Sequence, residues 1–229
     1  MSQVPNMVPA LPEIFVAVIG MALLMLGVFQ KAGDAGAEVR SARLVSRLGT
    51  VTLVLTMMLV ATVAGGTMDA FNGMFVSDPF AVFFKVLVLM ASALTLIISQ
   101  DFMERQGIAR FEYTILILFA TLGMMIMVSA NNLLSLYLGL EMQSLSLYVI
   151  ATFNRDDERS TEAGLKYFVL GAVASGMLLY GSSLVYGFAG TTDFATLGKM
   201  FADGHGPHAS LGLIVGIVFI LAGLSFKVS

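Results

Sequence analysis

Seven long apolar stretches divide this chain of 229 residues, and each is about long enough to cross a lipid bilayer. A helix needs about 20 apolar residues to span the hydrocarbon core, because each residue advances it by only about 1.5 Å. The pattern predicts an all-α polytopic membrane protein with about seven transmembrane helices. The predicted spans are 12–30, 48–66, 79–100, 113–130, 132–153, 163–188 and 210–228.

The composition excludes several other classes of protein. Apolar residues make up 58% of the chain and charged residues 12%, whereas a soluble domain carries about 25% charged residues. Cysteine is absent, which excludes disulfides, thiolate metal sites and cysteine-held Fe–S clusters. The net charge of −3 leaves no basic excess for binding nucleic acid. The lipid bilayer is therefore the first partner that the sequence predicts.

A turn is expected between the fourth and fifth stretches. Between Tyr113 and Asn154 the only charged residue is Glu141, and the segment is too long for one span. Asn131 and Asn132 are the turn-forming residues at its centre, so we place a tight hairpin there.

The basic residues set the expected orientation in the membrane. Eight of them fall in three connections that a seven-helix chain places on one side, whereas the opposite side holds Lys199 alone. This asymmetry is typical of the cytoplasmic face, so the N-terminus is predicted to lie outside. No basic residue precedes the first stretch, so it does not resemble a secretory signal and we expect that helix to be retained. The eight residues are Lys31, Arg40, Arg43, Arg47, Arg105, Arg110, Arg155 and Arg159.

Glu141 is the strongest functional candidate, because it lies deep within a predicted span. A charge at that depth costs about 2.5–3.5 kcal/mol even on a lenient scale, and such residues face the protein interior. Tyr137, Ser144 and Tyr148 share its helical face and form one polar stripe with it. The alternative is a protonated acid that only ties helices together.

Three lysines also fall within apolar stretches. Lys227 is either a deep group or a lysine that extends to the interface, and the pattern alone does not separate these readings. Lys166 follows Glu162 by four residues, a spacing that suits either an interfacial ion pair or a functional site. Lys85 is near the start of its span, so we expect its side chain to reach the interface, although Ser92 shares its face.

The remaining signals are weaker. His205 and His208 lie in a Gly- and Pro-containing connection with no third ligand nearby, so no metal site is predicted. No phosphate-binding loop or nucleophilic triad is present. Buried acids and amines suit transport of protons or ions rather than covalent catalysis. Small residues at helical spacing in the sixth span predict close helix packing: Gly171, Ala172, Ser175 and Gly176.

Three runs of residues resemble one known family. The run YLGLEMQSLSLY (Tyr137–Tyr148) is similar to the glutamate helix of the antiporter-like subunits of proton-pumping NADH:quinone oxidoreductase, respiratory complex I. The run from Glu162 to Gly187, followed by FAGTTDF, resembles the next helix of that family. LSFKVS (Leu224–Ser229) resembles the start of its lysine-bearing broken helix. Within the family, KYFVLG with a downstream GTTDF resembles the subunit N group in particular.

The resemblance implies roles for individual residues. Glu141 matches the key membrane glutamate, and Lys227 matches the lysine whose affinity for a proton that glutamate tunes. Lys166 matches a lysine that modulates or joins the proton path. Lys85 matches no general signature of the family. Because the family builds its site near the membrane midplane, the resemblance favours a deep Lys227.

The resemblance also implies a larger fold, of about fourteen helices in two inverted repeats. Residues 1–112 would form three N-terminal helices, and residues 113–229 an incomplete first antiporter-like repeat. The sequence is expected to be an N-terminal portion or a truncated product. It lacks the lysine of the eighth helix and the whole second repeat.

The function implied by the resemblance is proton translocation in a bacterial inner membrane, driven by redox chemistry in other subunits. Other membrane subunits of complex I would be partners, and NADH, FMN, Fe–S clusters and quinone would be bound in or at other subunits. This chain would hold no cofactor and no metal. Two alternatives stay open: a stand-alone cation/proton antiporter subunit, and a truncated scaffold without its own proton path.

Overall fold

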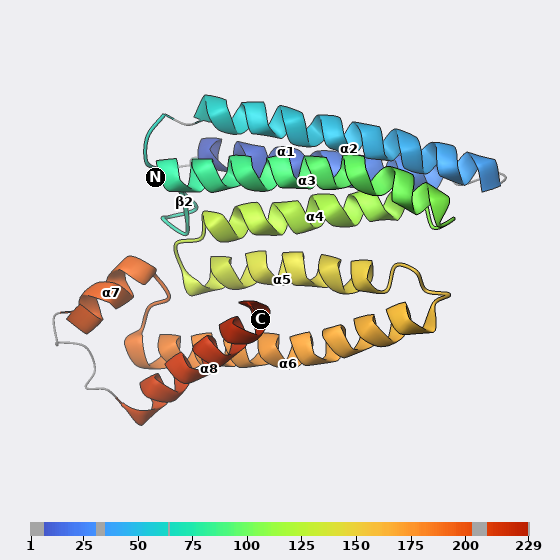
Figure 1. The fold of residues 1–229 in the computed structure, drawn as a ribbon. Coiled ribbons are helices and arrows are strands. Elements are labelled where there is room, and N and C mark those ends of the chain that lie inside the picture. The colour runs from blue at the N-terminus through green and yellow to red at the C-terminus, as the bar shows by residue number, and fades with distance from the viewer. Residues whose placement is uncertain (1–6, 31–34, 64, 203–209, 229) are drawn as a thin grey trace.

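The computed structural model describes residues 7–30, 35–63, 65–202 and 210–228, and these are almost entirely helical. Figure 1 shows α1 to α6 lying side by side, with α8 crossing α6 at an angle and ending beside α5. The helices are α1 (Leu11–Gln30), α2 (Ala35–Val63), α3 (Pro79–Arg105), α4 (Phe111–Val128), α5 (Leu133–Ala151), α6 (Glu158–Ala189), α7 (Phe194–Ala202) and α8 (Leu211–Val228).

Seven of the described helices are long and apolar enough to cross a membrane, which confirms the predicted all-α polytopic fold. One boundary was wrong by more than three turns. The residues from 31 to 47 were predicted to form a connection, but α2 already begins at Ala35. Arginine is a good helix former with a long stem that can reach water, so Arg40, Arg43 and Arg47 continue the helix beyond the apolar stretch.

Short polar side chains cap the N-termini of several of these helices. The Asp78 carboxylate accepts a hydrogen bond from the Ala81 N–H at 2.7 Å, and Pro79 occupies the first turn of α3. Asn132 caps α5 in the same way through the Ser135 N–H. The predicted turn at Asn131 and Asn132 is therefore confirmed. These caps supply partners for N–H groups in the first turns of α3 and α5, which the helix itself cannot pair.

A short β-hairpin between α2 and α3 was not predicted. It consists of β1 (Met68–Ala70) and β2 (Phe75–Ser77), which pair antiparallel. Three-residue strands are too short to give an alternating apolar pattern, so the sequence carried little signal for them. The hairpin packs against a 3-10 turn (Val8–Ala10) that precedes α1.

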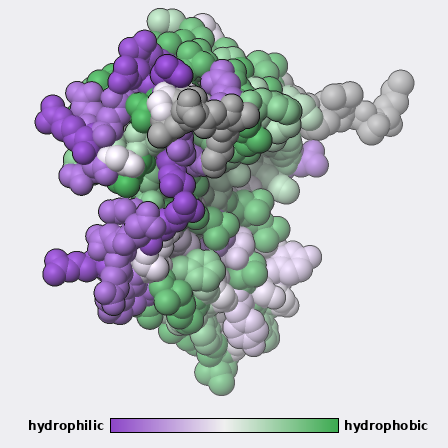
Figure 2. Space-filling model, turned by 90° about the vertical axis from the view of Figure 1, so that its right-hand side faces the viewer, coloured by the Kyte–Doolittle hydropathy of each residue, from purple (hydrophilic) through white to green (hydrophobic). Residues whose placement is uncertain are grey.

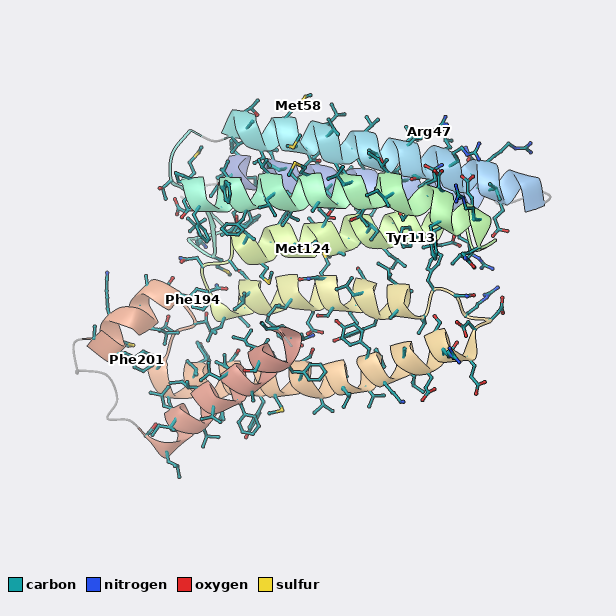
Figure 3. All side chains as sticks on the ribbon, in the orientation of Figure 1. Arg47, Met58, Tyr113, Met124, Phe194 and Phe201 are labelled. Atoms are coloured by element: carbon teal, nitrogen blue, oxygen red, sulfur yellow. The ribbon has the colours of Figure 1, made fainter. Side chains whose placement is uncertain are left out.

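The two ends of the helix bundle differ in charge. One end, here called the basic end, holds the α1–α2, α3–α4 and α5–α6 connections. Figure 2 looks onto this end and shows hydrophilic residues gathered over it, and Figure 3 places Arg47 toward it. The other end, here called the hairpin end, holds the β-hairpin and the short helix α7, on which Phe194 and Phe201 lie. This segregation agrees with the charge count, and which solution each end faces stays a prediction.

The helices pack as two groups that meet at α4 and α5. Helix α4 lies at the centre of the first group, with α1, α2 and α3 around it, and contributes buried residues such as Leu118 and Met125. Helices α5, α6 and α8 form the second group. Glycines join the two: a Cβ at Gly123 would lie 2.7 Å from the Gly139 carbonyl oxygen, so only glycine permits this approach of α4 and α5.

Asn131 ties the connections together at the hairpin end. Its side-chain amide donates to the Gly73 carbonyl in the β-hairpin at 2.9 Å and to the Asp193 carboxylate before α7 at 3.2 Å. Its backbone N–H donates to the Met74 carbonyl, and its carbonyl accepts from the Phe194 N–H. Asn131, in the α4–α5 turn, therefore joins the β-hairpin between α2 and α3 to the segment between α6 and α7.

Candidate proton-transfer site in the membrane

Lys227 and Glu141 meet near the middle of α5. Helix α8 runs from the hairpin end toward the centre of the bundle, so its last turn lies beside α5 rather than at an interface (Figure 1). The Lys227 Nζ is 3.5 Å from Glu141 Oε1, and the two side chains are 9% and 20% exposed. The structure thus places Lys227 deep in the bundle, as the resemblance implied. This pair is called the α5–α8 pair below.

Hydroxyl groups surround the α5–α8 pair. The Lys227 ammonium donates to Ser144 Oγ at 2.7 Å and to the Tyr148 hydroxyl at 3.0 Å. Both acceptors belong to the polar stripe predicted on α5, which therefore does face a neighbouring helix. Among the described residues, Tyr137 hydrogen-bonds to neither Glu141 nor Lys227, although it shares their side of α5.

Ser175 of α6 is a member of the site that sequence reasoning missed. Its hydroxyl donates to the Glu141 carboxylate. The sequence pattern indicates Ser175 only as one of several small packing residues, and that role is compatible with the hydrogen bond. A serine on the small-residue face of the helix after a buried glutamate is the signal that would have indicated it. Three helices, α5, α6 and α8, thus supply the site.

Tyr148 links the site to the small-residue face of α6. Its ring stacks edge-to-face with Tyr167, with centroids 4.7 Å apart, and lies 5.5 Å from the Lys227 Nζ. Its hydroxyl fits against Gly171, where a Cβ would overlap it. The predicted packing role of Gly171 therefore includes positioning a hydrogen-bond acceptor of Lys227.

Lys166 lies apart from this site. It forms an ion pair with Glu162 one turn earlier on α6 at 2.5 Å, and the two side chains are 69% and 60% exposed. An exposed pair of this kind contributes at most about 0.5 kcal/mol to stability. The geometry matches the ion-pair reading of the sequence, and it does not bring Lys166 to the α5–α8 pair.

Lys85 does not reach the interface, so that expectation was wrong. Its side chain is 1% exposed and its Nζ lies 2.7 Å from Glu13 Oε1 on α1, which is 6% exposed. The Phe75 ring centroid is 4.6 Å from the same Nζ. The Lys85 side chain cannot extend to the interface, because the β-hairpin and α1 cover this part of α3. Glu13–Lys85 is called the α1–α3 pair below.

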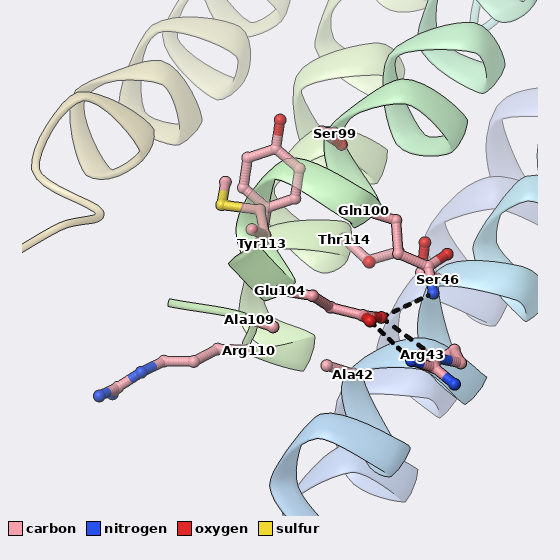
Figure 4. A pocket seen from close by; sticks show the side chains of 11 residues that line it. Ala42, Arg43, Ser46, Ser99, Gln100, Glu104, Ala109, Arg110, Tyr113 and Thr114 are labelled. Atoms are coloured by element: carbon pink, nitrogen blue, oxygen red, sulfur yellow. Dashed lines mark hydrogen bonds and ion pairs between the residues drawn. The ribbon is translucent and has the colours of Figure 1, made fainter. Parts of the chain in front are cut away.

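A third polar cluster lies at the basic end and is shown in Figure 4. Arg43 of α2 binds Glu104 of α3 through two hydrogen bonds of 2.6 and 3.1 Å, and Gln100 donates to the same carboxylate. The cavity beside it holds about 20 Å³, enough for about one water molecule. This cluster joins two helices, and the space is too small for a larger ligand. His205 and His208 lie outside the described residues, and no group of three metal-ligating side chains occurs within them.

Comparison with known proteins identifies relatives along the whole chain. The family model described as NADH:quinone oxidoreductase/Mrp antiporter, TM, matches residues 130–229. The chain is 58% identical to NADH-quinone oxidoreductase subunit N of Paramagnetospirillum magneticum over 98% of its length, and 54% identical to that of Parvibaculum lavamentivorans over its whole length. It covers 45% of each relative, so it spans a little under half the length of these proteins.

Solved structures share the fold. A chain of respiratory complex I from Thermus thermophilus matches with a TM-score of 0.71 and 28% identity, over 94% of this chain and 43% of that one. A chain of the Mrp complex from Dietzia matches with a TM-score of 0.62 and 22% identity, over 96% of this chain and 41% of that one, which is a likeness of fold alone. The same helical arrangement thus occurs in more than one kind of membrane complex.

Proposed function

We propose that this chain, which belongs to the subunit N group of the NADH:quinone oxidoreductase/Mrp antiporter family, moves protons through the membrane within a NADH:quinone oxidoreductase. The observation that carries the proposal is the α5–α8 pair: an ammonium 3.5 Å from a carboxylate near the middle of a membrane-spanning helix, among three hydroxyl groups. Intramembrane charges are costly, so pairs of this kind mark proton or ion paths.

The geometry suggests how such a pair passes on a proton. A carboxylate near Lys227 stabilises its ammonium form, whereas a more distant carboxylate leaves that charge without compensation in a medium of low dielectric constant. A lysine N–H bond then breaks, and the proton passes to a hydroxyl that already accepts from the ammonium, that of Ser144 or Tyr148, which releases its own proton onward. At 3.5 Å the pair is close but is not in direct hydrogen-bond contact, and Glu141 holds Ser175 while Lys227 holds Ser144 and Tyr148. Each partner therefore keeps a hydrogen bond of its own when the separation changes.

Lys166 enters the proposal as a secondary residue. It lies one residue before Tyr167, whose ring stacks on Tyr148, an acceptor of Lys227. Its exposed ion pair with Glu162 supplies a proton-carrying group at the α6 surface. We assign it a modulating role rather than a position beside Glu141.

The proposal places no redox cofactor on this chain. It has no cysteine to hold an Fe–S cluster. NADH, FMN, Fe–S clusters and quinone would be bound in or at other subunits, whose redox chemistry would supply the energy. The names of the bacterial relatives support a position beside other subunits of the complex in a bacterial inner membrane. The apolar helices support contact with the lipid bilayer.

The alternative is a cation/proton antiporter subunit, because the family model covers Mrp antiporters too and a Mrp chain shares the fold. Relatives at 47–58% identity, all named subunit N, favour the oxidoreductase. The dependence of proton movement on NADH oxidation separates the two functions.

The test replaces Glu141 with Gln in the complete subunit within its assembled complex. Glutamine keeps the size of the side chain and removes its charge, so the number of protons moved per electron is expected to fall while NADH oxidation continues. Glu158→Gln, an exposed residue at the start of α6, is the matched control and should leave that ratio unchanged. An unchanged ratio in Glu141→Gln would overturn the proposed role.

A further inference from the structure

Helix α8, which carries Lys227, packs along α6 through glycines of both helices (Figure 1). A Cβ at Gly181 of α6 would lie 2.6 Å from the Gly216 carbonyl oxygen of α8. Nearer the end of α8, a Cβ at Gly223 would lie 2.8 Å from the Ala174 carbonyl oxygen of α6. The two backbones therefore approach each other closely at two places, about two helical turns apart on α8.

The contact at Gly223 cannot be relieved by a side chain that turns away. The atoms nearest to an added Cβ are the Ala174 carbonyl oxygen, the Leu178 Cβ and the Leu178 backbone nitrogen, at 2.8, 3.0 and 3.1 Å. All three are fixed in position by the backbone of α6. Even one methyl group at Gly223 therefore has to move the last turns of α8 relative to α6.

This contact lies next to the α5–α8 pair on both of its helices. On α8, Gly223 is about one turn before Lys227. On α6, Ala174 immediately precedes Ser175, which donates to the Glu141 carboxylate. The residues thus form a closed ring of contacts, which runs from Gly223 along α8 to Lys227, across to Glu141, and back through Ser175 and Ala174. In such a ring, the α6–α8 distance at Gly223 helps to determine how far the Lys227 Nζ is from Glu141.

We propose that Gly223 is a positioning residue of the α5–α8 pair, because its contact with the Ala174 carbonyl sets the separation between Lys227 and Glu141. The inference rests on the proposed transfer of protons by this pair. Gly223 adds no group to the proton path, since it has no side chain that could carry a proton. One methyl group at Gly223 should therefore alter proton movement, although every charged and hydroxyl-bearing residue of the site is kept.

Gly223→Ala in the complete subunit, within its assembled complex, tests this role. We expect the number of protons moved per electron to fall toward the value of Lys227→Met, while NADH oxidation continues. Gly216→Ala is the matched control: its added Cβ also meets α6, at 3.0 Å from the Leu184 Cβ, but it lies about three turns before Lys227. Whatever it costs in stability, this control should keep the ratio near that of the unmodified complex. Equal falls in the two glycine variants would overturn the proposal.

The combined variant Gly223→Ala/Lys227→Met separates positioning from general damage to the fold. If Gly223 acts through Lys227, the combined variant loses no more of the ratio than Lys227→Met alone. A further loss in the combined variant, or an unchanged ratio in Gly223→Ala, overturns this inference, and the proposed function stands as long as Lys227→Met lowers the ratio. An unchanged ratio in Lys227→Met overturns the proposed function and this inference with it.

A second pair of variants keeps the test decisive if Gly223→Ala fails to assemble. Leu178→Ala removes buried side-chain atoms beside the Gly223 contact without adding volume to it. Leu184→Ala, beside Gly216, is its matched control. The ratio should fall further in Leu178→Ala than in Leu184→Ala, because only the former borders the contact that positions Lys227. Equal ratios in these two variants would overturn the proposal.

Discussion

The α5–α8 pair and the α1–α3 pair use the same two residue types in opposite ways. In the α5–α8 pair the charged atoms are 3.5 Å apart, and each partner also hydrogen-bonds to hydroxyl groups. In the α1–α3 pair they are 2.7 Å apart, and the carboxylate has no other partner among the described residues. The first pair can separate without leaving either charge unsolvated, whereas the second cannot separate without that cost.

This difference shows which pair suits a conformational step and which suits a fixed contact between two helices. A pair with supporting hydroxyls suits a mechanism in which the distance between the charges changes. A tight pair whose carboxylate oxygens are both covered suits a fixed contact that holds α1 against α3. The comparison therefore predicts different consequences when each lysine is removed.

The largest effect is expected for Lys85→Met. It leaves Glu13 buried without any partner, and breaking a buried ion pair in this way costs about 3–5 kcal/mol. Glu13→Leu/Lys85→Met should recover most of this loss, because no charge remains. Lys227→Met should cost less, because Glu141 keeps the Ser175 hydrogen bond. Denaturant titration of the complete subunit measures all three, and equal losses for the two lysine variants would contradict the comparison.

The next effect is expected at the glycines of α6. Gly171→Ala places a methyl group on the Tyr148 hydroxyl, and overpacking of this kind costs about 1–3 kcal/mol. It should also lower proton translocation, since Tyr148 is an acceptor of Lys227. Gly176→Ala is the matched control: nothing lies within 4 Å of its added Cβ, so thermal stability should stay equal or rise slightly. Similar behaviour of the two variants would argue against the close fit at Tyr148.

A smaller effect is expected for Lys166→Met. The residue is 69% exposed and its ion pair is on the helix surface, so stability should change by less than about 0.5 kcal/mol. Proton translocation should fall only partly, in contrast to its loss in Lys227→Met. Side-by-side rates of NADH-driven proton uptake measure this contrast. A loss in Lys166→Met as large as that in Lys227→Met would place Lys166 within the main path.

The smallest effect concerns the cover of the α1–α3 pair. Hydrogen bonds from the Thr196 hydroxyl and N–H lower the pKa of Asp193, whose carboxylate also accepts from Asn131 and so ties the β-hairpin. Because the folded-state pKa is lowered, this tie is fully present above the unfolded pKa of about 3.9 and is lost as the pH falls through the folded value.

The protection of the hairpin amides from hydrogen exchange, measured relative to the rate of an unfolded chain at the same pH, should therefore fall only at strongly acid pH. In Asp193→Asn the acid-dependent part of this change should disappear. If the protection of the hairpin amides already falls near neutral pH, Asp193 is not the group responsible.

The residue pattern predicted most of the membrane fold and the depth of Glu141, whereas the pairing of Glu141 with Lys227 was implied only by the family resemblance. Glu141 interrupts a long apolar run, and Asn131 and Asn132 are turn formers, so both were visible from position alone. Glu13 was not recognised because it lies in the first turn of its helix, where a charge is normally exposed to water. Its burial involves Lys85 of α3, whose ammonium is covered by Phe75 of the β-hairpin, and the hairpin is too short to leave a pattern.

The lysines show a similar limit. The burial of Lys85 depends on contacts with α1 and the β-hairpin, which are distant in sequence, whereas its position near a helix start suggested exposure. Ser175 looked like any small residue until α6 was placed against α5. Position within a span identified Glu141 as deep, but it misplaced Lys85, left Lys227 undecided and did not show which helix faces each charge.

A double-mutant cycle on the α5–α8 pair tests the central claim most directly. Glu141→Gln, Lys227→Met and the combined variant would each be measured for protons moved per electron in the assembled complex. If the two residues act as one unit, the combined variant loses no more than the more severe single variant. Losses that add independently would show that Glu141 and Lys227 do not handle the same proton, and would contradict the account.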